Sequence, residues 1–221
     1  MGESLKLKPL RLPPPLIVRS ATHPTAPRQP PPVSNLAAYC CTMRIRPARP
    51  NDATPIARVH VASWRHAYRG RMPDALLDGL SIPDRATTWT LRLQRDAPGY
   101  RYRVAESDGT IIGFASIGPA RGEVDCGELY TLYVDPARIG TGVGRALLAD
   151  AEEGLRALGH TRAILWVLDD NPRARRVYAA AGWVPDGGEK AAEFGGRMLR
   201  EVRYRLQIQI PHNQPPQSGH I

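Results

Sequence analysis

Residues 129–148 read LYTLYVDPARIGTGVGRALL, and this stretch decides the fold. Leu129–Val134 are aliphatic, aromatic or β-branched, which predicts a strand that Asp135-Pro136 ends. Glycines then alternate with other residues from Gly140 to Gly144, and apolar residues recur at helical spacing from Val143 to Leu158. Such a strand, loop and helix start form an anion site. The first helical N–H groups have no partner within the helix, and glycine lets a phosphate approach the backbone.

Two common phosphate loops do not fit this stretch. A Walker loop requires Lys and then Ser or Thr after the last glycine, and here Arg145-Ala146 follows Gly144. A dinucleotide-binding loop requires Gly-x-Gly-x-x-Gly near the start of repeated βαβ units. This chain instead has Gly140-x-Gly142-x-Gly144, late in the sequence. The ligand is therefore expected to be neither a nucleoside triphosphate nor a nicotinamide dinucleotide.

A second motif follows the apolar stretch 162–168, which predicts a buried strand. Asn171-Pro172 predicts the start of a helix, with asparagine as N-cap and proline at the first helical position. Tyr178 lies seven residues after Asn171, which is two helical turns, so both are expected on one side of the helix. Gly182 ends the predicted helix before Trp183.

Together, the two motifs resemble the acetyl-CoA-binding segments of the GNAT N-acetyltransferase superfamily. The loop matches the family pattern Q/R-x-x-G-x-G/A, except that Ile139 stands at the usual polar position and Arg138 one position earlier. Asn171, Ala174 and Tyr178 match the later pattern N-x-x-A-x-x-x-Y. The resemblance covers about residues 43–207. It implies an α+β fold with a mixed, mostly antiparallel sheet of six to seven strands, splayed central strands and about four flanking helices.

The resemblance also implies acetyl-CoA as acyl donor. Its pantetheine would lie along the strand that precedes the loop, and its pyrophosphate on the N–H groups of the loop. The residues expected to bind it are Leu132, Tyr133, Val134, Ile139, Gly140, Thr141, Gly142, Val143, Gly144, Arg145, Asn171 and Ala174.

Acetyl transfer to an amine requires that the ammonium lose a proton and that the departing thiolate gain one. By resemblance, Tyr178 is the expected general acid; the alternative is a tyrosine that packs beside the cofactor. Glu128 is the expected base, and strand parity predicts that it shares a face with Tyr130 and Leu132. The alternative is that Glu128 forms an ion pair with an arginine, and in that case a water chain would act as the base.

Trp64 and Tyr68 lie four residues apart on a predicted helix and are expected to line the acceptor cleft. Packing of these aromatic side chains in the core is the alternative. The predicted function is direct transfer of the acetyl group to a primary amine of a small molecule, peptide or protein. A non-catalytic acyl-CoA-binding regulatory module is the alternative function.

The bulk properties exclude several classes of protein. The chain has 221 residues and a formal net charge of +9, which suits an anionic ligand. No Lys/Arg run with interleaved aromatics occurs, so nucleic acid is not an expected partner. Three cysteines without a disulfide pattern indicate a reducing, cytoplasmic compartment. The histidines are scattered, so no metal site is expected. The chain has no apolar run of about 18 residues, so no membrane span is expected.

Composition divides the chain into three parts. Residues 1–42 contain nine prolines and no periodic pattern, so they are expected to be a disordered extension. Residues 43–207 form the predicted N-acetyltransferase domain, and residues 208–221 a disordered tail. We hypothesise that Met43 is the natural start. A homodimer is a further expectation from the resemblance.

Overall fold

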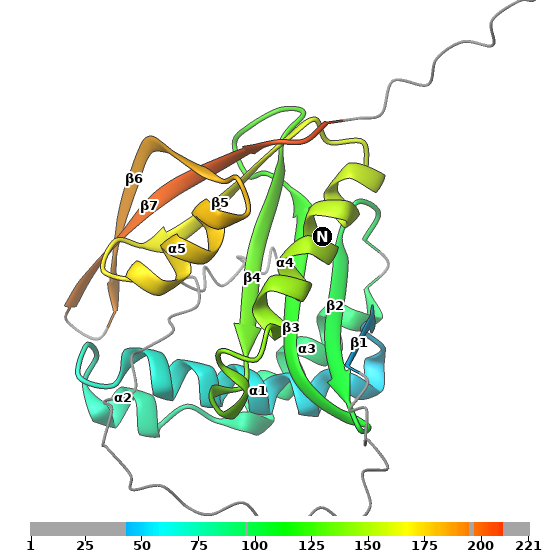
Figure 1. Cartoon of the computed structure of the whole chain (residues 1–221). Coiled ribbons are helices and arrows are strands. Elements are labelled where there is room, and N and C mark those ends of the chain that lie inside the picture. The colour runs from blue at the N-terminus through cyan, green and yellow to red at the C-terminus, as the bar shows by residue number, and fades with distance from the viewer. Residues whose placement is uncertain (1–42, 96, 195–196, 210–221) are drawn as a thin grey trace, which may run out of the picture.

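The computed structural model describes residues 43–95, 97–194 and 197–209, which share one seven-stranded sheet (Figure 1). Its strand order is β1-β2-β3-β4-β5-β7-β6. All neighbouring pairs are antiparallel except β4 and β5, which are parallel. The expectations for residues 1–42 and 210–221, including the hypothesis on Met43, lie outside the described residues.

The bounds of the elements follow the expected order. The strands are β1 (Arg44–Pro47), β2 (Arg101–Ser107), β3 (Thr110–Pro119), β4 (Gly127–Val134), β5 (Arg162–Leu168), β6 (Val184–Phe194) and β7 (Arg197–Gln207). The helices are α1 (Ala53–Tyr68), α2 (Asp74–Asp78), α3 (Ile82–Gln94), α4 (Val143–Ala157) and α5 (Pro172–Ala180). The described residues thus form five α-helices where about four were expected.

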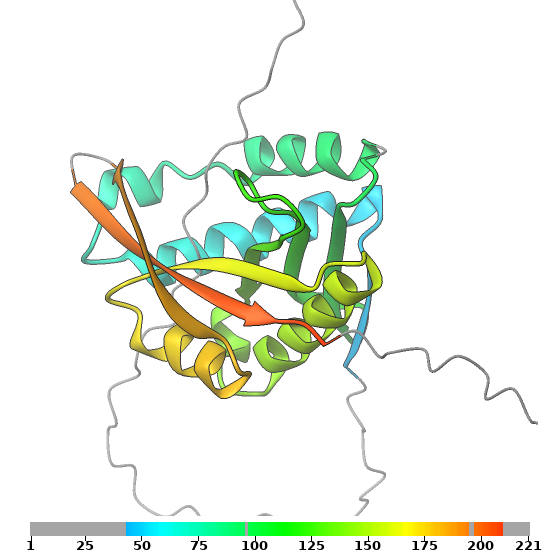
Figure 2. The same cartoon turned by 90° about the horizontal axis from the view of Figure 1, so that it is seen from above.

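Helices cover both faces of the sheet (Figure 2). One core joins α4 and α5 to Leu129, Leu132 and Val134 of β4 and to alternate residues of β5 and β7. A second core joins α1 and α3 to Phe114, Tyr133 and other residues of the opposite face. We call the face of the sheet that packs on α4 and α5 the α4/α5 face, and the face that packs on α1 and α3 the α1/α3 face.

Local sequence accounts for several of the boundaries. The β2–β3 hairpin turns at Asp108-Gly109, and both residues have positive φ angles, 49° and 73°. This is the two-residue turn that an Asp-Gly pair favours. Gly159, with φ of 85°, follows the end of α4, as expected for a helix stop.

The C-terminal hairpin differs from the prediction. A short strand was expected at Trp183-Val184, but β6 runs for eleven residues and pairs with β7 as far as Phe194. The sequence Asp186-Gly187-Gly188 has low strand propensity, and the pairing shifts register there. Partnership with β7 therefore decides this strand, and propensity does not.

The packed region reaches Ile208, because its side chain is buried and its N–H donates to the Thr161 carbonyl at 2.8 Å. Across the described residues, no helix has the length and apolar character that crossing a bilayer would require.

Candidate functional site

The two parallel strands at the centre of the sheet separate from one another. β4 pairs with β5 only at Gly127, Glu128 and Leu129, opposite residues 163–165. Beyond this point β4 stays on β3 and β5 stays on β7, so a gap opens between them (Figure 1). The splayed strands that the sequence comparison implied are therefore present.

A β-bulge marks the point of separation. Thr131 pairs with Ser116 and Leu129 with Ile117, which leaves Tyr130 as an extra residue on β4. Leu129 and Leu132 consequently both point to the α4/α5 core, although they are three residues apart. The bulge bends β4 just where β5 leaves it.

Beyond the bulge, the backbone of β4 turns amides toward the gap. The Asp135 N–H donates to the Ile112 carbonyl at 2.9 Å, so these two residues form a hydrogen-bonded antiparallel pair. Since such pairs alternate along a ladder, the amides of Leu132 and Val134 point away from β3 and toward the gap. The Val134 carbonyl also accepts a hydrogen bond from the Ser63 hydroxyl at 2.8 Å. The gap is thus lined by a strand edge that an amide-bearing chain can pair with.

At the end of this strand edge lies the glycine loop. Gly140 and Gly142 have φ angles of 90° and 93°, which residues with a side chain rarely adopt. Gly142 is the N-cap of α4, and the Ala146 N–H donates to its carbonyl at 3.1 Å. The N–H groups of Val143, Gly144 and Arg145 precede this first helical bond and have no helical partner. They form an anion site at the mouth of the gap.

Arginines surround the loop. The Nη2 atom of Arg173, at the start of α5, lies 3.5 Å from the place that a Cβ of Gly140 would occupy. Burial and the charge of Arg176 lower the pKa of Arg173. Among the described residues, no carboxylate forms an ion pair with Arg138, Arg145, Arg173 or Arg176. The sequence prediction did not include Arg173 and Arg176, although the basic run after the Asn171 cap was a signal for them.

The first turn of α5 faces the same opening. The Asn171 side chain caps this helix by accepting a hydrogen bond from the Ala174 N–H at 3.1 Å. Tyr178 lies two turns later and is buried, with its ring 6.5 Å from Trp183 and 6.4 Å from Tyr204. Burial raises the pKa of Tyr178. The phenol is therefore protonated throughout the neutral range.

Strand parity predicted that Glu128 and Leu132 share one face of the sheet, but they lie on opposite faces. Its carboxylate accepts from Arg121, with 2.5 Å between Arg121 Nη2 and Oε1, and is 3% exposed. Arg121 also lies 4.8 Å from the centre of the Tyr130 ring. Glu128 therefore shares the α1/α3 face with Tyr130 but not with Leu132. The prediction for Leu132 was wrong because the bulge inserts one residue between them.

Trp64 and Tyr68 pack in the core, as the alternative had it. Tyr68 has no exposed surface and Trp64 is 5% exposed. The Trp64 Nε1 group donates to the Tyr133 hydroxyl at 3.0 Å, and the rings of Trp64 and Tyr68 are 5.1 Å apart. They are part of the core beneath the α1/α3 face.

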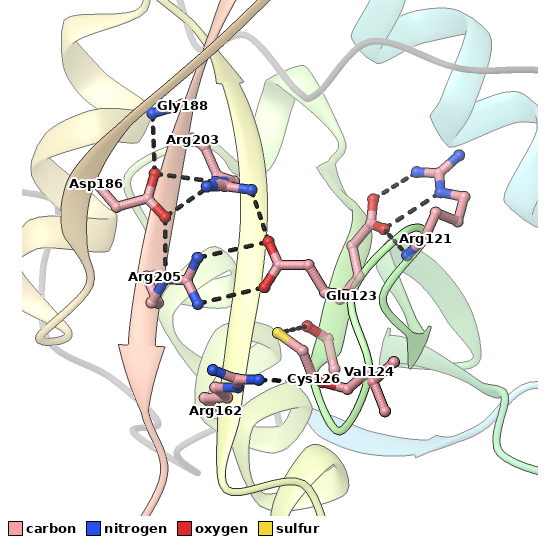
Figure 3. Close-up of polar contacts among 11 residues, drawn as sticks. Arg121, Glu123, Val124, Cys126, Arg162, Asp186, Gly188, Arg203 and Arg205 are labelled. Carbon is pink, nitrogen blue, oxygen red and sulfur yellow. Dashed lines mark hydrogen bonds and ion pairs between the residues drawn. The ribbon is translucent and has the colours of Figure 1, made fainter.

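An ion-pair network borders the α1/α3 face of β5 and β7 (Figure 3). Arg203 and Arg205 of β7 lie between Asp186 and Glu123, with Arg203 Nη1 to Glu123 Oε1 at 2.6 Å and Arg205 Nε to Asp186 Oδ2 at 3.0 Å. Lys190 lies 4.1 Å from the centre of the Trp166 ring and pairs with Glu201 at 2.9 Å. None of these contacts was predicted, since they join residues distant in sequence.

Comparison with known proteins decides the identity of this arrangement. The sequence model of the acetyltransferase (GNAT) family matches residues 60–183. An uncharacterized N-acetyltransferase of Bacillus subtilis, YuaI, is 35% identical over 160 residues, which cover 72% of this chain and 89% of that protein.

The chain belongs to the GNAT acetyltransferase family. A probable N-acetyltransferase of Mycobacterium tuberculosis is 28% identical over 72% of this chain and 95% of its own length. Among solved structures, the acetyltransferase YncA of Salmonella typhimurium with acetyl-CoA has the same fold, with a TM-score of 0.61 and 24% identity. That match covers 79% of this chain and 98% of YncA.

As a GNAT acetyltransferase, the protein is an N-acetyltransferase that uses acetyl-CoA as donor. The site fits this donor on its own chemistry. Pantetheine carries amide groups, and the open edge of β4 offers amides to pair with them. The phosphates of the donor match the free N–H groups at the start of α4 and the arginines around them.

Proposed function

We propose that this GNAT acetyltransferase transfers the acetyl group directly to a primary amine that enters from the α1/α3 face of the gap. The observation that carries the proposal is the bulge at Tyr130. It directs the Leu132 and Val134 amides into the gap while Glu128 faces the opposite side. A donor and an acceptor can thus approach the same point from two faces of the sheet.

On the donor side, the proposed contacts combine the strand edge with the loop. The main chain of Leu132–Val134 holds the pantetheine, and the N–H groups of residues 139–145 hold the pyrophosphate, with assistance from Arg145 and Arg173. Asn171 and Ala174 place the start of α5 against the donor. The Leu132 N–H donates to the carbonyl oxygen of the acetyl group, which makes the carbonyl carbon more electrophilic.

In the proposed reaction, a C–N bond forms between the amine and the acetyl carbon, and the C–S bond breaks. Glu128, directly or through water, takes the proton that the ammonium must lose. Tyr178 gives its proton to the departing sulfur, and the second proton, which the nitrogen loses as the amide forms, restores the phenol through water. Arg121 holds the Glu128 carboxylate in place through three hydrogen bonds, from its main-chain N–H, Nε and Nη2.

The experiment measures release of free CoA with a panel of amines, together with acetyl-CoA binding by calorimetry. Tyr178→Phe is expected to lower kcat by about 100-fold and Glu128→Gln by a similar factor, the usual contribution of a general acid or base. Neither change is expected to alter acetyl-CoA affinity. Glu193→Gln, on the exposed part of β6, is the matched control and should leave both quantities unchanged. Unchanged turnover in Tyr178→Phe and Glu128→Gln would refute the assigned roles.

A further inference from the structure

Two arginines on the inner side of α3 lie over aromatic rings. Arg85 and Arg92 are seven residues apart and therefore share one side of the helix. The guanidinium of Arg85 lies 5.5 Å from the centre of the Trp64 ring, and that of Arg92 lies 5.1 Å from the centre of the Trp89 ring. Both side chains are half-buried. Their orientation is thus fixed by stacking and not by an anionic partner.

Within residues 43–95, 97–194 and 197–209, neither arginine has an ion pair or hydrogen bond to a carboxylate. This separates them from Arg121 and Arg203, which lie on the same side of the sheet and are both paired with glutamates. Burial lowers the pKa of both Arg85 and Arg92. A half-buried cation without a counter-ion is costly, so two such residues together indicate a place for an anion.

Both arginines lie on the α1/α3 side of the sheet, the side that carries Glu128. Arg85 lies over the ring of Trp64, whose Nε1 donates to the hydroxyl of Tyr133 on β4 at 3.0 Å. The charges of Arg85 and Arg121 also lower the pKa of Arg92. Arg121 is the partner of Glu128 and contacts the Tyr130 ring. A molecule between α3 and β4 would therefore meet a carboxylate at one end and unpaired guanidinium groups at the other.

We propose that the acceptor amine also carries an anionic group, a carboxylate or a phosphate, and that Arg85 and Arg92 bind this group while the amine faces Glu128. The proposal rests on the proposed function and specifies its substrate class. Guanidinium groups suit this task because their planar N–H pairs match two oxygens of a carboxylate or phosphate. Electrostatic attraction would also concentrate such acceptors at the cleft.

The experiment compares acceptors that differ only in charge. Each amino acid and dipeptide of the panel is assayed beside its amide, and aminoalkyl phosphates beside the corresponding amino alcohols. The wild-type protein is expected to prefer the anionic member of at least one pair by about 10- to 100-fold in kcat/KM, the effect of a hydrogen bond to a charged group. The carboxylate and phosphate pairs tell which anion is recognised.

Arg85→Gln and Arg92→Gln are expected to lose this preference while kcat/KM for the uncharged member stays within about two-fold. Arg85→Lys should restore part of it, because it keeps the charge. Arg58→Gln, an exposed arginine on α1, is the matched control and should behave as wild type. Thermal unfolding of each variant separates a merely structural role, which would lower stability without changing the charge preference.

Equal rates for the anionic and neutral members, or an unchanged preference in both glutamine variants, would overturn the inference. So would acetylation of neutral amines alone. In each of these cases acetyl-CoA binding and CoA release with some amine would still support the proposed function. A wild-type protein that binds no acetyl-CoA would contradict the proposed function itself.

Discussion

His60 illustrates how one buried side chain couples the fold to pH. It is 1% exposed and lies against Tyr133, with ring centres 5.0 Å apart. Its Nδ1 atom accepts a hydrogen bond from Trp89 Nε1 at 3.2 Å, so this nitrogen carries no proton. Burial lowers the pKa of His60 to about 3, and the charges of Arg85 and Arg92 add to the effect. The histidine is therefore neutral in the folded protein.

The free energy of unfolding should fall as the pH falls through the range in which free histidine titrates. Below about pH 6.5 the unfolded chain takes up a proton on His60 that the folded chain does not. Between pH 7 and pH 5 this single group removes about 2 kcal/mol. Urea denaturation at both values measures the loss. His60→Phe should reduce the pH dependence by that amount, although it is less stable at pH 7 because Trp89 loses its acceptor.

His66 provides the control for this prediction, since it lies exposed on the same helix. His66→Phe should retain the full acid sensitivity. An identical slope in wild type and His60→Phe would show that His60 is not the group responsible.

At the scale of elements, the two capped helices α3 and α5 allow structure and function to be separated. Ser81 caps α3 by accepting from the Asp84 N–H at 3.2 Å, as Asn171 caps α5. Ser81→Ala and Asn171→Ala should each lower the free energy of unfolding by about 1 kcal/mol. Only Asn171→Ala should also raise the KM for acetyl-CoA, by several-fold, because α5 borders the donor site.

Denaturation curves and steady-state kinetics on both variants test this difference. A rise in KM in Ser81→Ala of the same size would mean that helix fraying in general weakens donor binding. An unchanged KM for acetyl-CoA in Asn171→Ala would show that α5 does not contribute to donor binding.

Sequence patterns predicted most of the elements, since their signals are local. The Asp108-Gly109 turn, the Asn171 cap and the glycines of the loop each fix the backbone within a few residues. The strand β6 was not predicted at full length because its pairing with β7 overrides weak local propensity. The sequence alone located the loop residues 140–144, because they are adjacent in the chain. It could not show that Arg173 reaches this loop from α5.

The predictions about side chains succeeded where neighbouring residues decide the outcome and failed where residues distant in sequence decide it. Glu128 was placed on the wrong face relative to Leu132, since a bulge is decided by the pairing of two strands and leaves no clear mark in one of them. Its ion pair with Arg121 was among the alternatives. The unpaired Arg85 and Arg92 could not be recognised, because an absence of partners is visible only after the chain is folded.

At the scale of the whole molecule, Glu123 connects the two halves of the sheet. It lies in the β3–β4 loop and binds Arg203 and Arg205 of β7 across β5 (Figure 3). Glu123→Gln leaves two arginines to share Asp186 and should lower the free energy of unfolding by about 1–2 kcal/mol, between the values for surface and buried pairs. Chemical denaturation measures the change.

Glu189→Gln is the matched control for Glu123. Glu189 pairs with Arg200, and both side chains are more than half exposed, so its loss should change stability by less than about 0.5 kcal/mol. Equal effects of the two substitutions would argue against a connecting role for Glu123.

The charge distribution predicts a salt effect on donor binding. The positive charges of Arg138, Arg145 and Arg173 lie in or beside the loop, and that of Arg176 acts on Arg173; none of the four has an ion-pair partner among the described residues. Raising the ionic strength from about 0.05 to 0.5 M screens them, so the KM for acetyl-CoA should rise several-fold while kcat changes little. Steady-state kinetics at the two salt concentrations test this, and a constant KM would contradict it.

The bulge at Tyr130 makes the number of residues in β4 matter as much as their identity. Backbone geometry there tolerates many side chains, so substitutions at Tyr130 need not disturb the strand. If the same residues formed a regular strand without the bulge, however, Glu128 and Leu132 would lie on one face, and the amides on one side of Tyr130 would exchange their direction between β3 and the gap. In the part of β4 beyond the bulge, a deletion is therefore a different kind of change from any substitution. A single-residue deletion between Thr131 and Val134 should abolish activity even where the fold survives, because it turns the amides that face the gap toward β3.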